Sequence, residues 1–246
     1  MKFQEKNVHP VKTSDDHFDT EGHMANVLIT GGAGFIGSHT ADALVSAGHR
    51  VRVLDILDPQ IHGTVKRFPL YMNTSVECIQ GDVTNAAEVD RVLDDIDVIY
   101  HFAAMTGVGQ SMYDIRAYVR TNCVGTATLL ESILKKKLAL KKLILSSSRA
   151  VYGEGTHECP KCGVAYPEMR KKRDLEEGRF EIKCQHCSSV MKSLATKEDA
   201  PLRPVSIYGW TKKAQEDLVR YAETTFSIPV TILRYFNVYG SRQSLD

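Results

Sequence analysis

The amino-acid sequence predicts an α/β protein built on a doubly wound parallel sheet with helices on both faces. Three observations support this fold class. Short apolar runs alternate with longer helix-like segments between residues 26 and 234, an order that is typical of parallel sheets. The first apolar run enters a glycine-rich turn that leads directly into a helix. Several runs also end in acidic or serine residues, and because ligands bind at the carboxyl ends of such strands, these residues mark a candidate site.

The glycine-rich turn follows a predicted strand at residues 27–30, and the helix after it begins near Phe35. Glycines spaced by three allow the backbone to turn tightly and to approach a pyrophosphate at the positive end of the helix. The next predicted strand ends in Asp55, where a Rossmann-type dinucleotide fingerprint places its ribose-binding acid. The carboxylate charge would repel a 2′-phosphate, which favours NAD over NADP. The alternative is a purely structural glycine turn. The glycines are Gly31, Gly34 and Gly37.

The rest of the chain continues the alternation up to residue 234. Apolar β-type runs predict further strands at residues 76–83, 98–102, 143–146 and 230–234. Helical periodicity predicts helices at residues 86–93 and 113–137 and within 204–226. The resulting domain covers residues 24–246.

Composition limits the classes of function. The chain of 246 residues has a formal net charge of +1 and 43% hydrophobic residues, so bulk charge gives no reason to expect a nucleic-acid or anionic-membrane partner. The sequence lacks an apolar run approaching the ~20 residues that span a bilayer. Residues 1–23 are polar and carry no secretory signal pattern; we interpret them as a disordered leader or an extension added by cloning. We expect a cytoplasmic protein.

One polar stretch, residues 154–196, interrupts the alternation and carries two Cys-x-x-Cys pairs. Two such pairs predict a zinc-ribbon-like module in which four thiolates hold a structural zinc ion. The alternatives are a redox-active Cys-x-x-Cys, or His157 or His186 in place of one cysteine. The basic run at 170–173 is short and followed by acidic residues, so a solvated face is favoured over a nucleic-acid site. The predicted ligands are Cys159, Cys162, Cys184 and Cys187.

Beyond the module, Tyr208 and Lys212 are four residues apart in a predicted helix, so their side chains share one face. A free phenol has a pKa near ~10. A neighbouring ammonium, together with the positive charge of an oxidised nicotinamide, would lower that pKa and make the phenol a usable base. An amphipathic surface helix is the alternative explanation of the same spacing.

These motifs occur in the order found in a known family. The chain resembles extended short-chain dehydrogenases/reductases, in particular the NAD-dependent nucleotide-sugar epimerases and dehydratases, over residues 26–240. The matching segments are Thr30–His39, Gly81–Val83, His101–Ala104, Thr121–Thr126, Ser146–Gly153, Tyr208–Lys212 and Arg234–Gly240.

The resemblance assigns roles. It implies that Tyr208 is the acid/base, that Lys212 tunes it and holds the nicotinamide ribose, and that Ser148 binds the reacting sugar oxygen. Asn237 would lie near the phosphates of the substrate. The implied cofactor-binding set is Gly31, Gly34, Phe35, Ile36, Gly37, Asp55 at the adenosine ribose, Asp82 and Val83 at the adenine, Ala103 and Ala104 at the nicotinamide, Asn122, Tyr208 and Lys212.

The same resemblance favours a 4-epimerase. Dehydratases of the family carry Asp-Glu where this chain has Arg149 and Ala150, which cannot exchange the protons that dehydration requires. Within the epimerases the sequence is similar to those acting on dTDP-L-rhamnose, and a dTDP- or UDP-hexose is the expected substrate. A reductase, decarboxylase or dehydratase of the same fold, or a non-catalytic NAD-binding or zinc-ribbon module, are the alternatives.

Two further expectations come from the family alone. Its members continue into a substrate-binding lobe beyond the motif that ends at Gly240, and we expect that lobe to be absent from this chain. Members also often form homodimers through two long helices, which here correspond to residues 113–137 and 208–226.

Overall fold

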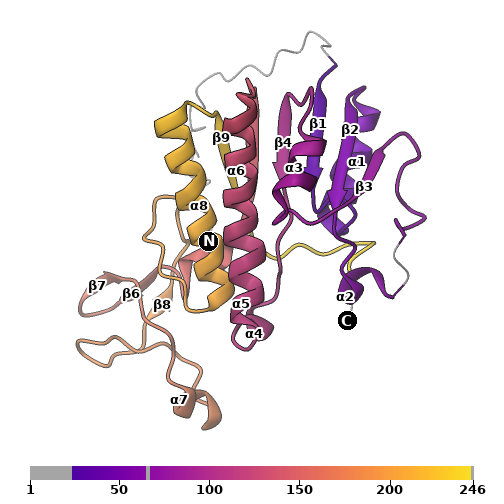
Figure 1. Ribbon diagram of the computed structural model, residues 1–246. Coiled ribbons are helices and arrows are strands. Elements are labelled where there is room, and N and C mark those ends of the chain that lie inside the picture. The colour runs from indigo at the N-terminus through magenta and orange to yellow at the C-terminus, as the bar shows by residue number, and fades with distance from the viewer. Residues whose placement is uncertain (1–23, 65–66, 245–246) are drawn as a thin grey trace, which may run out of the picture.

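A computed structural model describes residues 24–64 and 67–244 of the chain. The expected leader, residues 1–23, lies outside the described residues. The centre of the molecule is a six-stranded sheet that is parallel, as predicted, with the strand order β3-β2-β1-β4-β5-β9 (Figure 1). Its strands are β1 (Asn26–Thr30), β2 (Arg50–Asp55), β3 (Glu77–Gln80), β4 (Val98–His101), β5 (Lys142–Ser148) and β9 (Val230–Tyr235).

Helices cover both faces of this sheet because neighbouring strand residues point to opposite sides. In β1, Leu28 belongs to the apolar core that includes side chains of α3, α6 and α8, whereas Val27 and Ile29 belong to a second core that includes Ala41 of α1. Figure 1 shows α6 and α8 side by side along one face. The covering helices are α1 (Phe35–Ser46), α3 (Ala86–Val92), α6 (Gly125–Lys136) and α8 (Ile207–Phe226).

The strand order places a topological switch between β1 and β4. The chain runs outward from β1 to β2 and β3 on one side, then returns to β4 on the other side of β1. The loops leaving β1 and β4 therefore diverge and open a crevice at their carboxyl ends, which is where ligands bind in sheets of this type.

The helix predicted at residues 113–137 is interrupted by a π-helical turn. It begins as α5 (Ile115–Tyr118), widens into the π-helical segment η1 (Val119–Val124) and continues as α6. The helix ends at Lys137, which adopts a left-handed conformation with φ of 52°. Periodicity predicted the helix but not the wide turn, which lies where the buried side chain of Asn122 points inward.

Other predicted boundaries shift because of local contacts. The strand predicted at 76–83 is limited to β3, and the chain at Gly81 to Val83 instead forms part of the crevice wall. Outside the cysteine-rich stretch, three short helical turns of the described chain were not predicted: α2 (Pro59–His62), α4 (Val108–Ser111) and η2 (Arg149–Tyr152), a 3₁₀ turn directly after β5.

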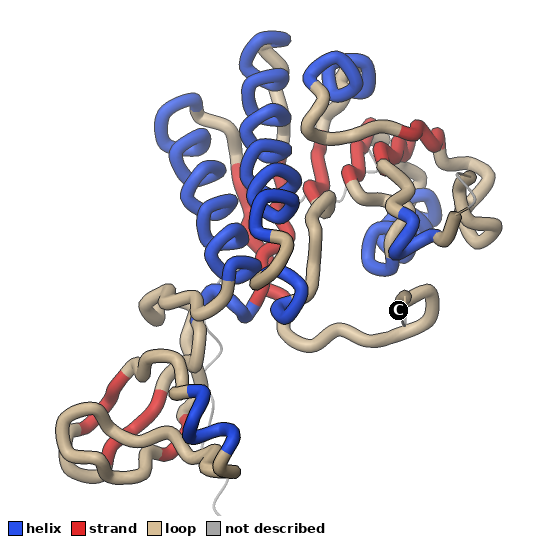
Figure 2. The backbone as a smooth tube through the Cα atoms, turned by 60° about the horizontal axis from the view of Figure 1, so that its bottom comes forward, coloured by secondary structure: helices blue, strands red, loops and turns tan. Residues whose placement is uncertain are grey.

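The cysteine-rich stretch forms a small antiparallel sheet, which stands apart from the main sheet in Figures 1 and 2. At its base, Thr156 and residues 194–196 are joined by hydrogen bonds, including Thr156 N–H to Thr196 Oγ1 at 3.0 Å. The module contains its own apolar cluster around Cys159, Cys184 and Met191. Its elements are β6 (His157–Cys159), β7 (Gly163–Ala165), α7 (Lys172–Glu176) and β8 (Lys192–Ser193), with strand order β7-β6-β8.

Candidate functional site

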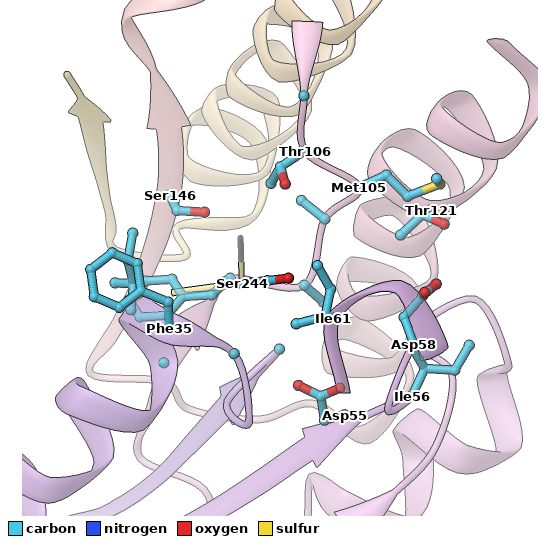
Figure 3. Close-up of a pocket in the computed structure, with 18 of the residues that line it drawn as sticks. Phe35, Asp55, Ile56, Asp58, Ile61, Met105, Thr106, Thr121, Ser146 and Ser244 are labelled. Carbon is cyan, nitrogen blue, oxygen red and sulfur yellow. The ribbon is translucent and has the colours of Figure 1, made fainter. Parts of the chain in front are cut away.

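A cavity of about 690 Å³ lies at the carboxyl ends of the strands, in the crevice that the topology predicts. Figure 3 shows side chains around it from the start of α1, the end of β2, the loop after β4 and from β5, with Ser244 of the C-terminal segment among them. Most of the residues proposed from the sequence line this cavity: Gly31, Gly34, Phe35, Ile36, Gly37, Asp55, Asp82, Val83, Ala103, Ala104, Ser148, Tyr208 and Lys212.

The glycine turn brings the start of α1 to the cavity. Gly31 has a φ of +70°, which disfavours residues with a side chain, and a Cβ there would lie 2.6 Å from the backbone nitrogen of Ala103. At Gly34, by contrast, a Cβ would meet no atom closer than 3.5 Å. The fold itself therefore requires a glycine at residue 31, whereas the glycine at residue 34 mainly keeps the cavity wall open.

Asp55 is held with its carboxylate at the cavity wall (Figure 3). Its Oδ2 accepts a hydrogen bond from Ala33 N–H at 3.0 Å, and its Oδ1 accepts one from Leu57 N–H at 2.9 Å. The Nε2 atom of His62, on α2, lies 3.8 Å from Oδ1. His62 also lines the cavity, and sequence reasoning missed it because a four-residue helix leaves no periodic signal.

Ser148 and Tyr208 also line the cavity and meet there, from the end of β5 and the first turn of α8. The helix is capped by Ser206, whose Oγ accepts from Gly209 N–H at 3.0 Å, and Tyr208 N–H donates to Ser111 Oγ at 3.0 Å. Burial raises the pKa of Tyr208, and the hydrogen bond with Ser148 opposes that shift. Within the protein, desolvation of Tyr208 outweighs its hydrogen bond with Ser148. The lowering of this pKa by Lys212 together with an oxidised nicotinamide stays a prediction.

Lys212 lies one turn further along α8 and is buried. Its Nζ atom donates to Gln215 Oε1 at 2.7 Å. Burial lowers the pKa of Lys212 to about 7, and the negative charge of Glu216 acts against that shift. Gln215 was not proposed from the sequence, although its spacing of three from Lys212 places it on the same face of the helix.

Two proposed residues are not among those that line the cavity in the described part of the chain. Asn122 is buried beside it, where Oδ1 accepts from Met105 N–H at 2.8 Å and Nδ2 donates to Thr211 Oγ1 at 2.9 Å. Asn122 therefore holds the loop after β4 against α8. Asn237 is exposed, and its Oδ1 accepts from Arg149 Nε at 3.3 Å.

The four cysteines of the inserted module converge. Their Sγ atoms all lie within 4.8 Å of one another, with Cys159 and Cys184 buried and Cys162 exposed. Hydrogen bonds from Ser189 lower the pKa of Cys187 to about 6, which favours a thiolate at neutral pH.

The basic run of the module is paired with acids. The guanidinium of Arg170 contacts Glu154 at 3.1 Å, and Arg173 contacts Glu177 at 2.8 Å. Within residues 24–64 and 67–244, none of the helices is both long and apolar enough to cross a bilayer.

The sheet order, the glycine turn and the Tyr208–Lys212 pair on one cavity define a Rossmann-type protein of the short-chain dehydrogenase/reductase class. The sequence profile of the NAD dependent epimerase/dehydratase family matches residues 27–171 and 183–246. The chain belongs to this family.

Individual relatives agree. The chain is 38% identical over 221 residues to a dTDP-L-rhamnose 4-epimerase of Burkholderia thailandensis, covering 89% of this chain and 59% of that protein. It is 32% identical to a UDP-glucose 4-epimerase of Azospirillum brasilense, covering 91% and 52%. A crystal structure of UDP-glucuronic acid 4-epimerase from Bacillus cereus, with UDP-glucuronic acid and NAD, matches with a TM-score of 0.68 and 34% identity over 90% of this chain and 59% of that one. The chain thus spans about half to three-fifths of the length of these relatives.

Proposed function

We propose that the protein is an NAD-dependent nucleotide-sugar 4-epimerase acting on a dTDP- or UDP-hexose, with dTDP-L-rhamnose as a candidate. The observation that carries the proposal is the meeting of Ser148 and Tyr208 on the same cavity as the glycine turn and Asp55. The names of the relatives, which include dTDP-L-rhamnose, UDP-glucose and UDP-glucuronic acid 4-epimerases, support this class of substrate.

The residues of the cavity fit NAD. The two oxygens of Asp55 are each fixed by one backbone N–H, which leaves acceptor capacity for ribose hydroxyls. The open space over Gly34 and the N-terminus of α1 suit a pyrophosphate. When bound, NAD supplies a reversible hydride acceptor at C4 of the sugar.

Residues of the protein would carry out the proton transfer and hold the sugar oxygen. Tyr208 Oη would take the proton of the sugar 4-hydroxyl and later return it, and Ser148 Oγ would hold the same oxygen by a hydrogen bond. Because burial raises the pKa of Tyr208, the phenol needs positive charge nearby to act as a base. Among the described residues that line the cavity, Lys212, one helical turn away, is the lysine that can provide this charge.

A tyrosine variant tests the proposal. In Tyr208→Phe the proton acceptor is lost while the ring is kept, so we expect epimerisation of dTDP- or UDP-sugars to fall by at least a thousandfold with NAD still bound. Product analysis by NMR would also reveal a dehydratase, reductase or decarboxylase. Retention of wild-type epimerisation in the variant would contradict the assigned role, and binding of NAD without any turnover by the wild type would favour a non-catalytic module.

We also propose that residues 154–196 form a zinc-ribbon-like module inserted in a domain that covers residues 24–246. A Zn–S bond of about 2.3 Å places tetrahedral sulfurs about 3.8 Å apart, which the described cluster can reach with small side-chain movements. A closed set of four sulfurs leaves no position for a reacting water, so the role is structural. Free, clustered thiols also favour a reducing, cytoplasmic location.

A homodimer is the remaining proposal. The two helices expected at the interface carry exposed apolar side chains: Ile115, Val124 and Trp210 are 48–50% exposed and Tyr221 is 70% exposed. Exposed apolar patches of this kind are typical of interfaces. Sedimentation equilibrium measures the mass of the assembly directly.

A further inference from the structure

A row of buried, hydrogen-bonded polar side chains begins at Lys212, which lines the cavity, and continues into the protein interior. It starts at Lys212, whose Nζ donates to Gln215 Oε1, and continues from Gln215 Nε2 to Thr126 Oγ1 at 2.6 Å. Thr126 Oγ1 lies 2.9 Å from His101 Nε2, and His101 Nδ1 lies 2.7 Å from Thr30 Oγ1. These side chains come from α8, α6, β4 and β1, and each is at most 2% exposed.

One set of directions fits the hydrogen bonds of this row, apart from a 3.5 Å approach of Gln215 Nε2 to His101 Nε2. Burial and the charge of Lys212 lower the pKa of His101 to about 3, so its ring is neutral, with one donor and one acceptor. The Thr126 hydroxyl donates to the carbonyl of Asn122 at 2.7 Å, and its oxygen must therefore accept from the ring. His101 carries its hydrogen on Nε2, and Nδ1 accepts from the hydroxyl of Thr30.

The far end of the row returns to the cavity. The oxygen of Thr30 accepts from the backbone N–H of Ala103 at 3.3 Å, and Ala103 lines the cavity wall. Lys212 lines the same cavity. One continuous set of hydrogen bonds thus joins two points of the cavity wall through the protein interior.

The assigned directions also fix the amide of Gln215. Its N–H donates to Thr126, so its carbonyl oxygen faces the ammonium of Lys212. A rotated amide would place donor against donor at Lys212. A buried ammonium without an acceptor would lose its proton more readily, so the carbonyl of this amide supports the charge on Lys212 together with the negative charge of Glu216.

We propose that His101, Thr126 and Gln215 are positioning residues that hold the Lys212 ammonium and the Ala103 backbone at the floor of the cavity. None of the three is among the residues that line the cavity in the described part of the chain, so they act through Lys212 and Ala103. The proposal rests on the proposed function to the extent that the positioned groups serve NAD.

Thr126 is the residue on which to test the row. Thr126→Val keeps the shape and removes the hydroxyl, whereas Thr126→Ser keeps the hydroxyl. Thr128→Val makes the same change at another buried threonine of α6, outside the row, and is the matched control. Two quantities are measured on the full chain: the dissociation constant of NAD, and the ¹⁵N NMR signals of the His101 ring.

We expect wild type and Thr126→Ser to show a His101 ring protonated on Nε2 that stays neutral through the range around 6.5 in which histidines ordinarily titrate. Thr126→Val should shift the Nε2–H signal and weaken NAD binding at least fivefold, and Thr128→Val should change neither quantity.

Thr126→Val with wild-type ring signals and wild-type NAD affinity would overturn the proposal, as would an equal loss in Thr128→Val. If the wild type binds no NAD, the proposed function fails, but the ring signals still decide whether the row exists. A wild-type ring protonated on Nδ1 would show that the assigned directions are wrong.

Discussion

At the scale of single residues, the glycine turn separates two requirements that look identical in sequence. Gly31 is required by backbone conformation and by the approach of Ala103, whereas Gly34 has a φ of −70° and a ψ of 178°, which any residue adopts. A methyl group added at residue 31 should therefore lower stability, whereas one added at residue 34 should weaken NAD binding.

Gly31→Ala should lower the free energy of unfolding by about 2 kcal/mol or more, because the left-handed conformation alone costs about 1–2 kcal/mol and the Cβ would overlap Ala103. Gly34→Ala should change stability by less than about 1 kcal/mol but weaken NAD binding at least tenfold, since its methyl group narrows the cavity. Urea denaturation and NAD titration of both variants separate the effects. Wild-type NAD affinity in Gly34→Ala would contradict this account.

Individual site residues also differ in whether they could be predicted from the sequence. Tyr208 and Lys212 could be proposed because helix faces follow from local patterns, and Ser148 because the resemblance to the family assigned it a role. His62 and Gln215 could not be assigned, because the first needs the chain reversal at α2 and the second needs α6 as a neighbour. The lowered pKa of Lys212 likewise follows from burial that only packing creates.

At the scale of elements, one buried ion pair joins α8 to its neighbours. Glu216 on α8 accepts from Arg234 on β9 at 2.9 and 2.8 Å and from the hydroxyl of Ser147 on β5. Arg234 also donates to the hydroxyl of Tyr152 and to the carbonyl of Glu198. These last two residues flank the inserted module, so the pair fixes its base as well as the helix that carries Lys212.

The Glu216→Gln substitution should therefore lower the free energy of unfolding. It leaves the guanidinium of Arg234 without its counter-charge, and removing one partner of a buried pair costs about 3–5 kcal/mol; the amide retains part of the hydrogen bonding, so we expect about 2–4 kcal/mol. Asp217→Asn is the matched control, because Asp217 pairs with Lys213 near the surface, where such pairs contribute about 0–1 kcal/mol. If urea denaturation gave the same decrease in the free energy of unfolding for Glu216→Gln and Asp217→Asn, Glu216 would have no special role in stability.

The boundaries of strands and helices show which of them local sequence patterns can predict. Strands β1, β2, β4 and β5 were located correctly because both faces of a covered parallel sheet are apolar and give continuous runs. The strand predicted at 76–83 was too long, because residues 81–83 line the cavity and do not pair in the sheet. The π-helical turn at η1 follows from the inward bonds of Asn122, which no local pattern encodes.

At the scale of the whole molecule, the main sheet and the inserted module have cores of different origin. The main sheet buries apolar side chains on both faces, whereas the core of the inserted module is largely its cysteines and Met191. Under the proposed zinc site, a polar segment with so little apolar surface would fold only with its metal, whereas the main sheet has an apolar core on each face. The two parts should therefore respond separately to loss of metal.

We expect about one zinc ion per chain. Its removal by a chelator, or by Cys159→Ser combined with Cys184→Ser, should abolish amide-exchange protection between residues 156 and 194 and leave β1 and β4 protected. The boundary should fall at the base of the module, because Gly155 and Thr196 lie beside main-domain contacts held by Arg234. Cys78→Ser, at a lone cysteine packed on the main sheet, is the control and should keep the zinc. Absence of metal in the purified protein would exclude the zinc site, and loss of protection throughout the sheet would show that the two cores fold as one unit.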